Sequence, residues 1–280
     1  EQRRVRQALL DSEARFREIE ADFRAMAAEL DFKQTTLIPI SALKGDNIVN
    51  SSAAMPWYTG TPLLQTLEES DVHRKGAAGT RFTVQYVLRP QSTELHDFRG
   101  FAGVLRSGEF KTGQKVRVEP SGEEATITAL HFSGQPVSEI YADDSAVIEL
   151  DRDIDISRGD IFVPVGETVR KSALFSARLT HLDTAALKLN YAYYLMCGTR
   201  KVKAMVKSIN SKLDIHSLKF NAGGEANAVA LNEIAEVTIK TAQPIVFDSY
   251  RDNWTTGAAV LVDAQTNMTS AALMHNEAID

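Results

Sequence analysis

The run Phe82-Thr83-Val84-Gln85-Tyr86-Val87 decides the fold of this chain, because apolar and polar residues begin to alternate there. Alternation with a period of two is typical of a strand with one buried face and one solvated face. Upstream, at Phe16, Ile19 and Phe23, apolar residues recur at steps of three and four, which is typical of a helix. The sequence therefore predicts a change from helical to β structure near residue 81.

Short apolar runs separated by glycine turns follow from this point. They are residues 82–87, 100–105, 115–119, 125–132 and 146–150. Runs of this length and spacing, with turns such as Ser107-Gly108 and Thr112-Gly113 between them, are typical of a small closed barrel. We expect a first antiparallel β-barrel over residues 79–166, with Pro164-Val165-Gly166 at its end.

A second set of β runs occupies the rest of the chain. The candidate strands are residues 173–179, 187–196, 201–209, 226–239 and 258–263. The turns between them include Asn221-Ala222-Gly223-Gly224 and Thr255-Thr256-Gly257, whose residue types suit tight turns. We expect a second antiparallel β-barrel over residues 170–280.

The part of the chain before the barrels predicts an α/β segment over residues 1–70. The apolar spacing predicts a helix over about residues 1–35, and the run Leu37-Ile38-Pro39-Ile40 has the length of a buried strand. Thr61-Pro62 offers an N-cap followed by proline at the first helical position, so a short second helix is expected there, with its leucines at 63, 64 and 67 directed inward. The expected fold class is mainly β, two small barrels preceded by an α/β remnant.

Composition excludes several classes of protein. With 280 residues, 44% of them hydrophobic and 24% charged, the chain can bury a substantial core and is neither a disordered tail nor a disulfide miniprotein. A net charge of −6 gives no field that recruits a polyanion, so nucleic acid is not an expected partner. No apolar run has the length of about 18 residues that a membrane span needs, so no membrane association is expected.

Cysteine usage and the first residues favour a reducing cytoplasm. Cys197 is the single cysteine and cannot form an internal disulfide, and Glu1-Gln2-Arg3-Arg4 lacks the apolar run of a signal peptide. Cys197 follows the apolar run Tyr193-Tyr194-Leu195-Met196 without a local histidine, which favours a buried, unreactive thiol over a nucleophile.

The residues offer little catalytic or metal-binding chemistry, and no catalytic residue and no metal site are expected. The six histidines are scattered without a second ligand at zinc spacing. Residues 151–155 superficially resemble a calcium loop, but Ile156 and Phe162 stand where glycine and glutamate are needed, so a solvated strand end is expected. Lysines at 201, 203 and 207 alternate with apolar residues, which fits either a phosphate-gripping ridge or, more simply, a strand with one wet face.

Two motifs nevertheless resemble those of a known superfamily. Ile38-Pro39-Ile40-Ser41-Ala42-Leu43-Lys44-Gly45-Asp46-Asn47 resembles the last guanine-recognition motif of translation-factor GTPases, and the resemblance implies that Ser41, Ala42, Leu43 and Lys44 contact the base of GTP. Arg99-Gly100-Phe101-Ala102-Gly103-Val104 and Asp155-Ile156-Ser157-Arg158-Gly159-Asp160 resemble the second-domain barrel of the elongation factor Tu superfamily. Residues 1–70 would then be the C-terminal remnant of a GTPase domain.

Within that superfamily the chain resembles the large, GTPase subunit of bacterial sulfate adenylyltransferase. The residues that carry this resemblance are Pro56-Trp57-Tyr58-Thr59-Gly60, Phe82 to Val87, Asp97 to Gly103 and Thr256 to Asp263. The resemblance implies pairing with a small catalytic subunit that makes adenosine 5′-phosphosulfate from ATP and sulfate, while GTP hydrolysis drives the synthesis. It also implies GTP and Mg²⁺ as cofactors of the full-length protein.

The family's phosphate loop, magnesium-side switch and Asn-Lys-x-Asp motif lie upstream of the first helix and are missing from this sequence. Asp97-Phe98-Arg99-Gly100 matches the pattern of the switch, but it opens a β run and is interpreted as an accident. We therefore expect an N-terminally truncated fragment that neither binds GTP tightly nor hydrolyses it alone. Two further interpretations stay open: a standalone β-barrel binding module, and a translation-factor-like RNA-binding protein, against which no concentrated basic patch with interleaved aromatic residues is evident.

Overall fold

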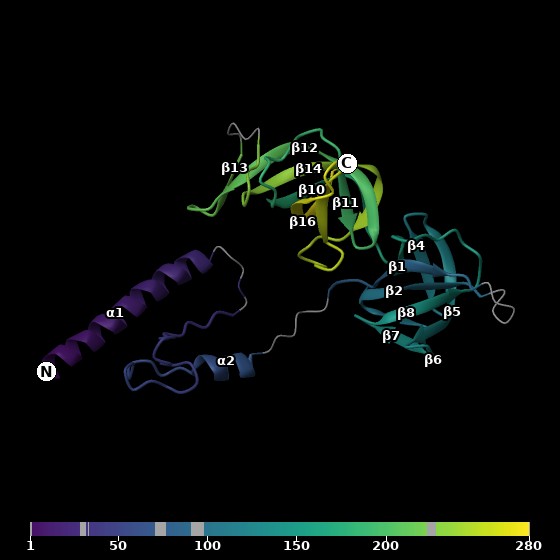
Figure 1. Ribbon diagram of the computed structural model, residues 1–280. Helices are drawn as coiled ribbons and strands as arrows, with labels where there is room; N and C mark the ends of the chain where they lie inside the picture. The colour runs from purple at the N-terminus through teal and green to yellow at the C-terminus, as the bar shows by residue number, and fades with distance from the viewer. Residues whose placement is uncertain are drawn as a thin grey trace. The chain divides into compact units, whose positions relative to one another are not determined.

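The computed structural model describes residues 2–28, 32, 34–70, 77–90, 98–222 and 228–279. It divides into two units, residues 1–74 and residues 75–280, and each is described by itself (Figure 1). Within these described ranges, no helix is long and apolar enough to cross a membrane.

The first unit contains the helices α1 (Gln2–Ala27) and α2 (Leu63–Glu69). Helix α1 confirms the periodicity but ends earlier than the expected residue 35. Phe16 anchors it within the unit, because its ring lies 5.3 Å from the ring of Trp57 and 6.4 Å from that of Tyr58, measured between centroids. Burial of large aromatic rings is the main source of packing energy in so small a contact.

Two predictions for this unit are wrong. Residues 37–40 form no strand, because a strand needs a neighbour for its backbone groups and the described residues of the unit supply only an isolated bridge between Ser41 and Asp46. In α2, Pro62 is the N-cap in place of Thr61, and Leu67 is 62% exposed in place of pointing inward. Leu64 is exposed as well, since no described sheet lies against this face of the helix.

The first barrel confirms the period-two prediction. Its strands are β1 (Arg81–Leu88), β2 (Gly100–Ser107), β3 (Glu109–Lys111), β4 (Lys115–Glu119), β5 (Glu123–Phe132), β6 (Gln135–Val137), β7 (Glu139–Tyr141), β8 (Ser145–Leu150) and β9 (Ile161–Pro164). The main sheet runs β4-β9-β1-β2-β8-β5-β6 and closes through pairing of β4 with β5, while β3 pairs with β7. In its core the ring of Phe82 stacks on that of Phe162, and Phe101 meets Phe162 edge to face.

Close approach of β1 and β2 explains a glycine in the first barrel. A Cβ atom on Gly103 would lie 2.2 Å from the carbonyl oxygen of Thr83, which is impossible without moving the backbone. Glycine at this position lets β2 pass directly over the ring of Phe82.

The second barrel consists of longer strands. They are β10 (Arg170–His181), β11 (Tyr193–Cys197), β12 (Arg200–Asp214), β13 (Lys219–Ala222), β14 (Ile234–Phe247), β15 (Ala258–Asp263) and β16 (Thr269–Ala278). The sheet runs β11-β15-β16-β10-β14-β12-β13 and closes through pairing of β11 with β12 (Figure 1). The fold class predicted from sequence, two antiparallel barrels after an α/β segment, is thus confirmed for the barrels.

Two strand predictions in this barrel need correction. Residues 187–192 form a loop and not the first part of a strand, because Asn190 adopts a φ of 52° that ends any extended run. The strand expected from residue 226 begins at Ile234; residues 226 and 227 lie outside the described part of the chain. Strand β16 was not predicted at all.

Candidate functional site

The predicted guanine loop, Ser41 to Lys44, is a tight turn closed by its own backbone. The carbonyl oxygen of Ser41 accepts hydrogen bonds from the N–H groups of Lys44 at 3.2 Å, Gly45 at 2.8 Å and Asp46 at 3.2 Å. Among the described residues, the N–H groups of Ala42 and Leu43 have no acceptor, and the side chain of Leu43 is 96% exposed. The turn therefore presents free backbone donors beside an apolar side chain, a combination that fits the carbonyl edge of a purine base.

Asn47 fixes this turn from beneath. Its buried side chain donates from Nδ2 to the carbonyl oxygen of Pro39 at 2.8 Å and accepts at Oδ1 from the N–H of Ser52 at 2.8 Å. The backbone carbonyl of Asn47 accepts from the N–H of Leu63 at 2.9 Å, which ties the turn to the start of α2. Its φ of 52° is one that asparagine tolerates better than most residues. Sequence reasoning included Asn47 in the motif but did not predict that it organises the loop.

The turn at Ser41–Lys44 has the features of neither a phosphate-binding site nor a metal-binding site. Phosphates are usually held by a glycine-rich loop leading into a helix N-terminus. In the part of the chain that the structure describes, no three His, Cys, Asp or Glu side chains gather as a group that could hold a metal ion. The turn from Ser41 to Lys44 has backbone donors and an exposed apolar side chain, and the described residues offer no cluster of three His, Cys, Asp or Glu beside it.

A buried arginine joins the two barrels. Arg81, at the start of β1, is 3% exposed and donates to Asp248 from Nε at 3.0 Å and from Nη2 at 2.9 Å. Its Nη1 donates to Glu167, in the segment between the barrels, at 2.5 Å. Burial pushes the pKa of Arg81 down, but the hydrogen bonds and charges of Asp248 and Glu167 outweigh it and leave the pKa above its ordinary value. The buried positive charge of Arg81 is therefore compensated by the carboxylates of Asp248 and Glu167.

Further polar contacts surround this arginine. The buried amide of Asn253 in the second barrel donates to Ser107 Oγ at 2.9 Å and to the carbonyl oxygen of Ala78 at 3.0 Å. Thr199 donates to the carbonyl oxygen of Val84 at 2.8 Å. Buried polar groups that are fully hydrogen-bonded favour one arrangement over others, because any displacement leaves several of them unpaired. We call Arg81, Glu167, Asp248 and Asn253 the barrel joint.

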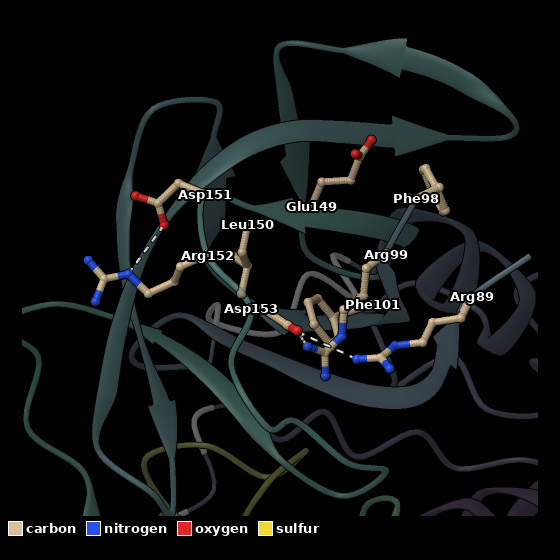
Figure 2. Close-up of a pocket in the computed structure, with 9 residues that line it drawn as sticks. All are labelled: Arg89, Phe98, Arg99, Phe101, Glu149, Leu150, Asp151, Arg152 and Asp153. Atoms are coloured by element: carbon tan, nitrogen blue, oxygen red, sulfur yellow. Dashed lines mark hydrogen bonds and ion pairs between the residues drawn. The ribbon is translucent and has the colours of Figure 1, made fainter. Parts of the chain in front are cut away.

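A pocket of about 440 Å³ opens on the first barrel (Figure 2). It is lined by Arg89, Phe98, Arg99, Phe101, Glu149, Leu150, Asp151, Arg152 and Asp153. Figure 2 shows Arg89 and Arg99 converging on Asp153 from one side, while Arg152 turns away toward Asp151. The guanidinium of Arg99 lies 5.2 Å from the centre of the Phe101 ring, which forms an aromatic floor beneath it.

The charges of this pocket largely cancel. Asp153, with its side chain 78% exposed, pairs with both Arg99 and Arg89, the latter at 3.5 Å. Burial, and then the nearby charge of Arg89, lowers the pKa of Arg99. Glu149 faces His131, whose Nε2 lies 2.6 Å away. Sequence reasoning did not predict this pocket, because Arg89, Arg99 and residues 149–153 are separate in sequence and meet only in the folded barrel.

The structure shows the burial of the other residues that the sequence analysis weighed as sites. Asp151, Asp153 and Asp155 are exposed after the end of β8, in agreement with the expected solvated strand end. Burial raises the pKa of the Cys197 thiol to about 12, so the thiol stays protonated and agrees with the expected unreactive cysteine. His275 is buried between Phe175 and Phe247, with ring centroids 4.9 and 4.8 Å away.

Comparison with known proteins gives the chain's relatives. Residues 174–274 match a family model described as GTP-eEF1A C-terminal domain-like. The chain is 38% identical over 93% of its length to the bifunctional enzyme CysN/CysC of Mycobacterium tuberculosis, of which it covers 42%. It is 34% identical over 96% of its length to sulfate adenylyltransferase subunit 1 of Psychromonas ingrahamii, covering 56% of that protein, and 38% identical over 92% to that of Francisella tularensis, covering 54%.

The chain thus spans about half the length of the curated relatives it matches. Among solved structures, the fold resembles sup35 complexed with GDP, with a TM-score of 0.65 and 18% identity over 89% of this chain and 60% of that one. It also resembles sup35 complexed with GMPPNP, with a TM-score of 0.66 and 19% identity over 96% of this chain and 66% of that one. At these identities the likeness concerns the fold.

Proposed function

We propose that this chain is part of the GTPase subunit of sulfate adenylyltransferase, because it is similar over nearly its whole length to subunit 1 of that enzyme. In this function the subunit couples GTP hydrolysis to the synthesis of adenosine 5′-phosphosulfate from ATP and sulfate. The observation that carries the proposal is identity of 34–38% across at least 92% of the chain, which includes the guanine loop, both barrels and the joint between them.

The role proposed for the first unit is recognition of guanine. The free N–H groups of Ala42 and Leu43 would donate to the base, while Ser41 holds the turn closed and Lys44 lies at its exposed edge. Bound GTP supplies the free energy of hydrolysis, and its phosphates and Mg²⁺ would be held by residues other than these four. Residues 1–70 act in this proposal as the C-terminal part of a GTPase domain.

The role proposed for the barrels, residues 79–166 and 170–280, is transmission to a small catalytic subunit that carries out adenylyl transfer. An element that couples two sites works best as a rigid body, because independent motion of its parts weakens the coupling between the sites. The barrel joint supports this role, since Arg81 is held by carboxylates on both sides of it. Sulfate assimilation for cysteine biosynthesis in the cytoplasm is the corresponding cellular setting.

The proposal is tested by copurification with the small catalytic subunit of sulfate adenylyltransferase and by titration with GTP. We expect the 280-residue chain to be retained on the immobilised small subunit, since the proposal assigns the partner contact to the barrels, which this chain contains. Calorimetry with GTP should give binding weaker than micromolar, because Ser41 to Lys44 contact only the base. Absence of retention would contradict the proposed partner, and micromolar or tighter GTP affinity would contradict the limited role of the loop.

A further inference from the structure

Five lysines gather on one outward surface of the second barrel. Lys201, Lys203 and Lys207 lie on β12, Lys240 lies on the neighbouring strand β14, and Lys188 lies in the loop before β11. All five are exposed. We call these five residues the lysine face.

Strand register places these side chains together. Tyr194 on β11 pairs with Lys203, and Met196 pairs with Lys201. Across the other edge of β12, Met205 pairs with Lys240. Paired residues of antiparallel strands have their side chains on the same face at about 5 Å, so the pairing places Lys201, Lys203 and Lys240 on one face. Lys207 lies at a register shift of β12, and its hydrogen bond to Asn190 sets it beside the loop that carries Lys188.

The lysine face carries little negative charge of its own. The strand segments that form it, residues 193–197, 200–209, 237–247 and 258–262, contain no Asp or Glu. Asp263, at the end of β15, is buried and accepts a hydrogen bond from Tyr191 at 3.4 Å. Within the described ranges, none of its five lysines forms an ion pair, whereas Lys111, Lys171 and Lys212 elsewhere each have a carboxylate partner. The nearest polar partner is neutral, since Lys207 Nζ donates to Asn190 Oδ1 at 2.6 Å.

Such a cluster is unusual in a chain whose net charge is −6. Neighbouring like charges repel, so the lysine face destabilises the free chain. A partner that brings carboxylates to the face would reduce this repulsion. The clustering corrects the sequence expectation that the chain has no concentrated basic patch with interleaved aromatic residues. The sequence indicated only Lys201, Lys203 and Lys207, because Lys240 joins them from a neighbouring strand and Lys188 from a loop.

Tyrosines and apolar side chains accompany the lysines. The ammonium of Lys201 lies 4.0 Å from the centre of the Tyr194 ring, and that of Lys188 lies 4.6 Å from the Tyr191 ring. Met196 is 40% exposed, and next to it Val260 and Val262 of β15 are partly exposed. A central apolar strip with a charged margin is the composition of a protein interface.

We propose that the lysine face is the docking surface for an acidic surface of the small catalytic subunit, an inference that rests on the proposed function. A protein partner fits better than RNA for two reasons. The net charge of the chain opposes a polyanion, which extends well beyond the face. The tyrosine rings are covered by Lys201 and Lys188, so their faces are not open to stacking bases.

The test measures association of the 280-residue chain with the purified small catalytic subunit by biolayer interferometry at several salt concentrations. The variant is Lys203→Glu with Lys240→Glu, since both side chains are exposed and neither ammonium makes a hydrogen bond or ion pair to another described residue. The matched control is Lys115→Glu with Lys219→Glu, which makes the same change in net charge at exposed positions outside the face. Circular dichroism establishes that all three proteins are folded.

We expect the variant to associate about tenfold more slowly than the unchanged chain near 0.1 M salt, with the difference shrinking at 1 M salt, and the control to differ by less than twofold. Binding by the unchanged chain with equal rates for variant and control would overturn the lysine face while leaving the proposed partner intact. Absence of binding by the unchanged chain would overturn both. Tight binding of a fluorescent 20-nucleotide RNA that the variant abolishes, with the small subunit unaffected, would assign the face to a polyanion and overturn the proposal.

Discussion

Replacement of Arg81 by methionine tests the barrel joint directly. Methionine keeps much of the length and packing of the side chain but removes the guanidinium, so Asp248 and Glu167 lose their shared cation. Removing one partner of a buried ion pair costs about 3–5 kcal/mol, because the remaining charge stays desolvated. Asp248 and Glu167 keep some contact with water, with side chains 14% and 26% exposed, so we expect the lower end of that range, about 3 kcal/mol.

Hydrogen exchange locates this loss. A cost of about 3 kcal/mol corresponds to roughly a hundredfold increase in the population of the opened joint. We expect amides near the joint, in residues 78–81 and 248–257, to exchange about a hundredfold faster in Arg81→Met. Amides in the barrel cores, such as those of Val116 and Val237, should change far less, since their hydrogen bonds are made within one barrel.

The matched control is Arg89→Met. Arg89 also pairs with a carboxylate, Asp153, but both side chains are mostly exposed and lie 3.5 Å apart, so the pair should contribute less than about 1 kcal/mol. A double variant of Arg81→Met with Asp248→Leu should cost less than the sum of its single changes, because it leaves no unpaired Asp248 carboxylate. Equal effects of Arg81→Met and Arg89→Met on exchange and on urea stability would refute the argument.

Three further predictions concern single residues. Burial lowers the pKa of His275 from its ordinary 6.5 to about 4, so the unfolded chain takes up this proton at a higher pH than the folded chain. The free energy of unfolding, measured by urea titration, should be full above pH 6.5 and fall by about 2–3 kcal/mol by pH 4.5. His275→Phe should remove this fall. Asn47→Ala should destabilise the Ser41–Lys44 turn by about 1–3 kcal/mol and speed exchange of the Ser52 amide, and unchanged exchange there would contradict the anchoring role of Asn47. Cys197 should resist alkylation by iodoacetamide at pH 8 in the folded chain and react once urea unfolds it, because the thiol is protonated; rapid labelling of the native protein would disprove this.

The strands that the sequence predicted are those with enough residues to display alternation. Strands β1, β4 and β15 were found within a residue or two of their observed bounds, because one face of each is buried and the other is not. Strands β3, β6 and β7 have three residues each, too few to show a period. The run at residues 37–40 has the composition of a strand, but composition does not reveal whether a neighbouring strand is available to pair with it.

The site was predictable only where it is contiguous in sequence. Ser41 to Lys44 form a short motif that could be named from the sequence, and their contact with a base stays a prediction. The barrel joint could not, because Arg81 meets its partners 86 and 167 residues further along the chain. In the sequence, an arginine at the start of a strand is expected to be exposed. Only the folded structure shows that a carboxylate of the other barrel pairs with it and buries it. The full lysine face could not be predicted either, since Lys240 joins Lys201, Lys203 and Lys207 only from a neighbouring strand.

The affinity of the chain for the small catalytic subunit of sulfate adenylyltransferase tests the central claim most directly. Isothermal titration calorimetry at 0.15 M salt should give a one-to-one complex with a dissociation constant of about a micromolar or tighter, the range of a specific protein interface. The same titration with the Lys203→Glu, Lys240→Glu variant should weaken binding, because both residues belong to the lysine face. No heat of binding at subunit concentrations of about 100 μM, with both proteins folded, would contradict the assignment of these barrels as the part that meets the catalytic partner.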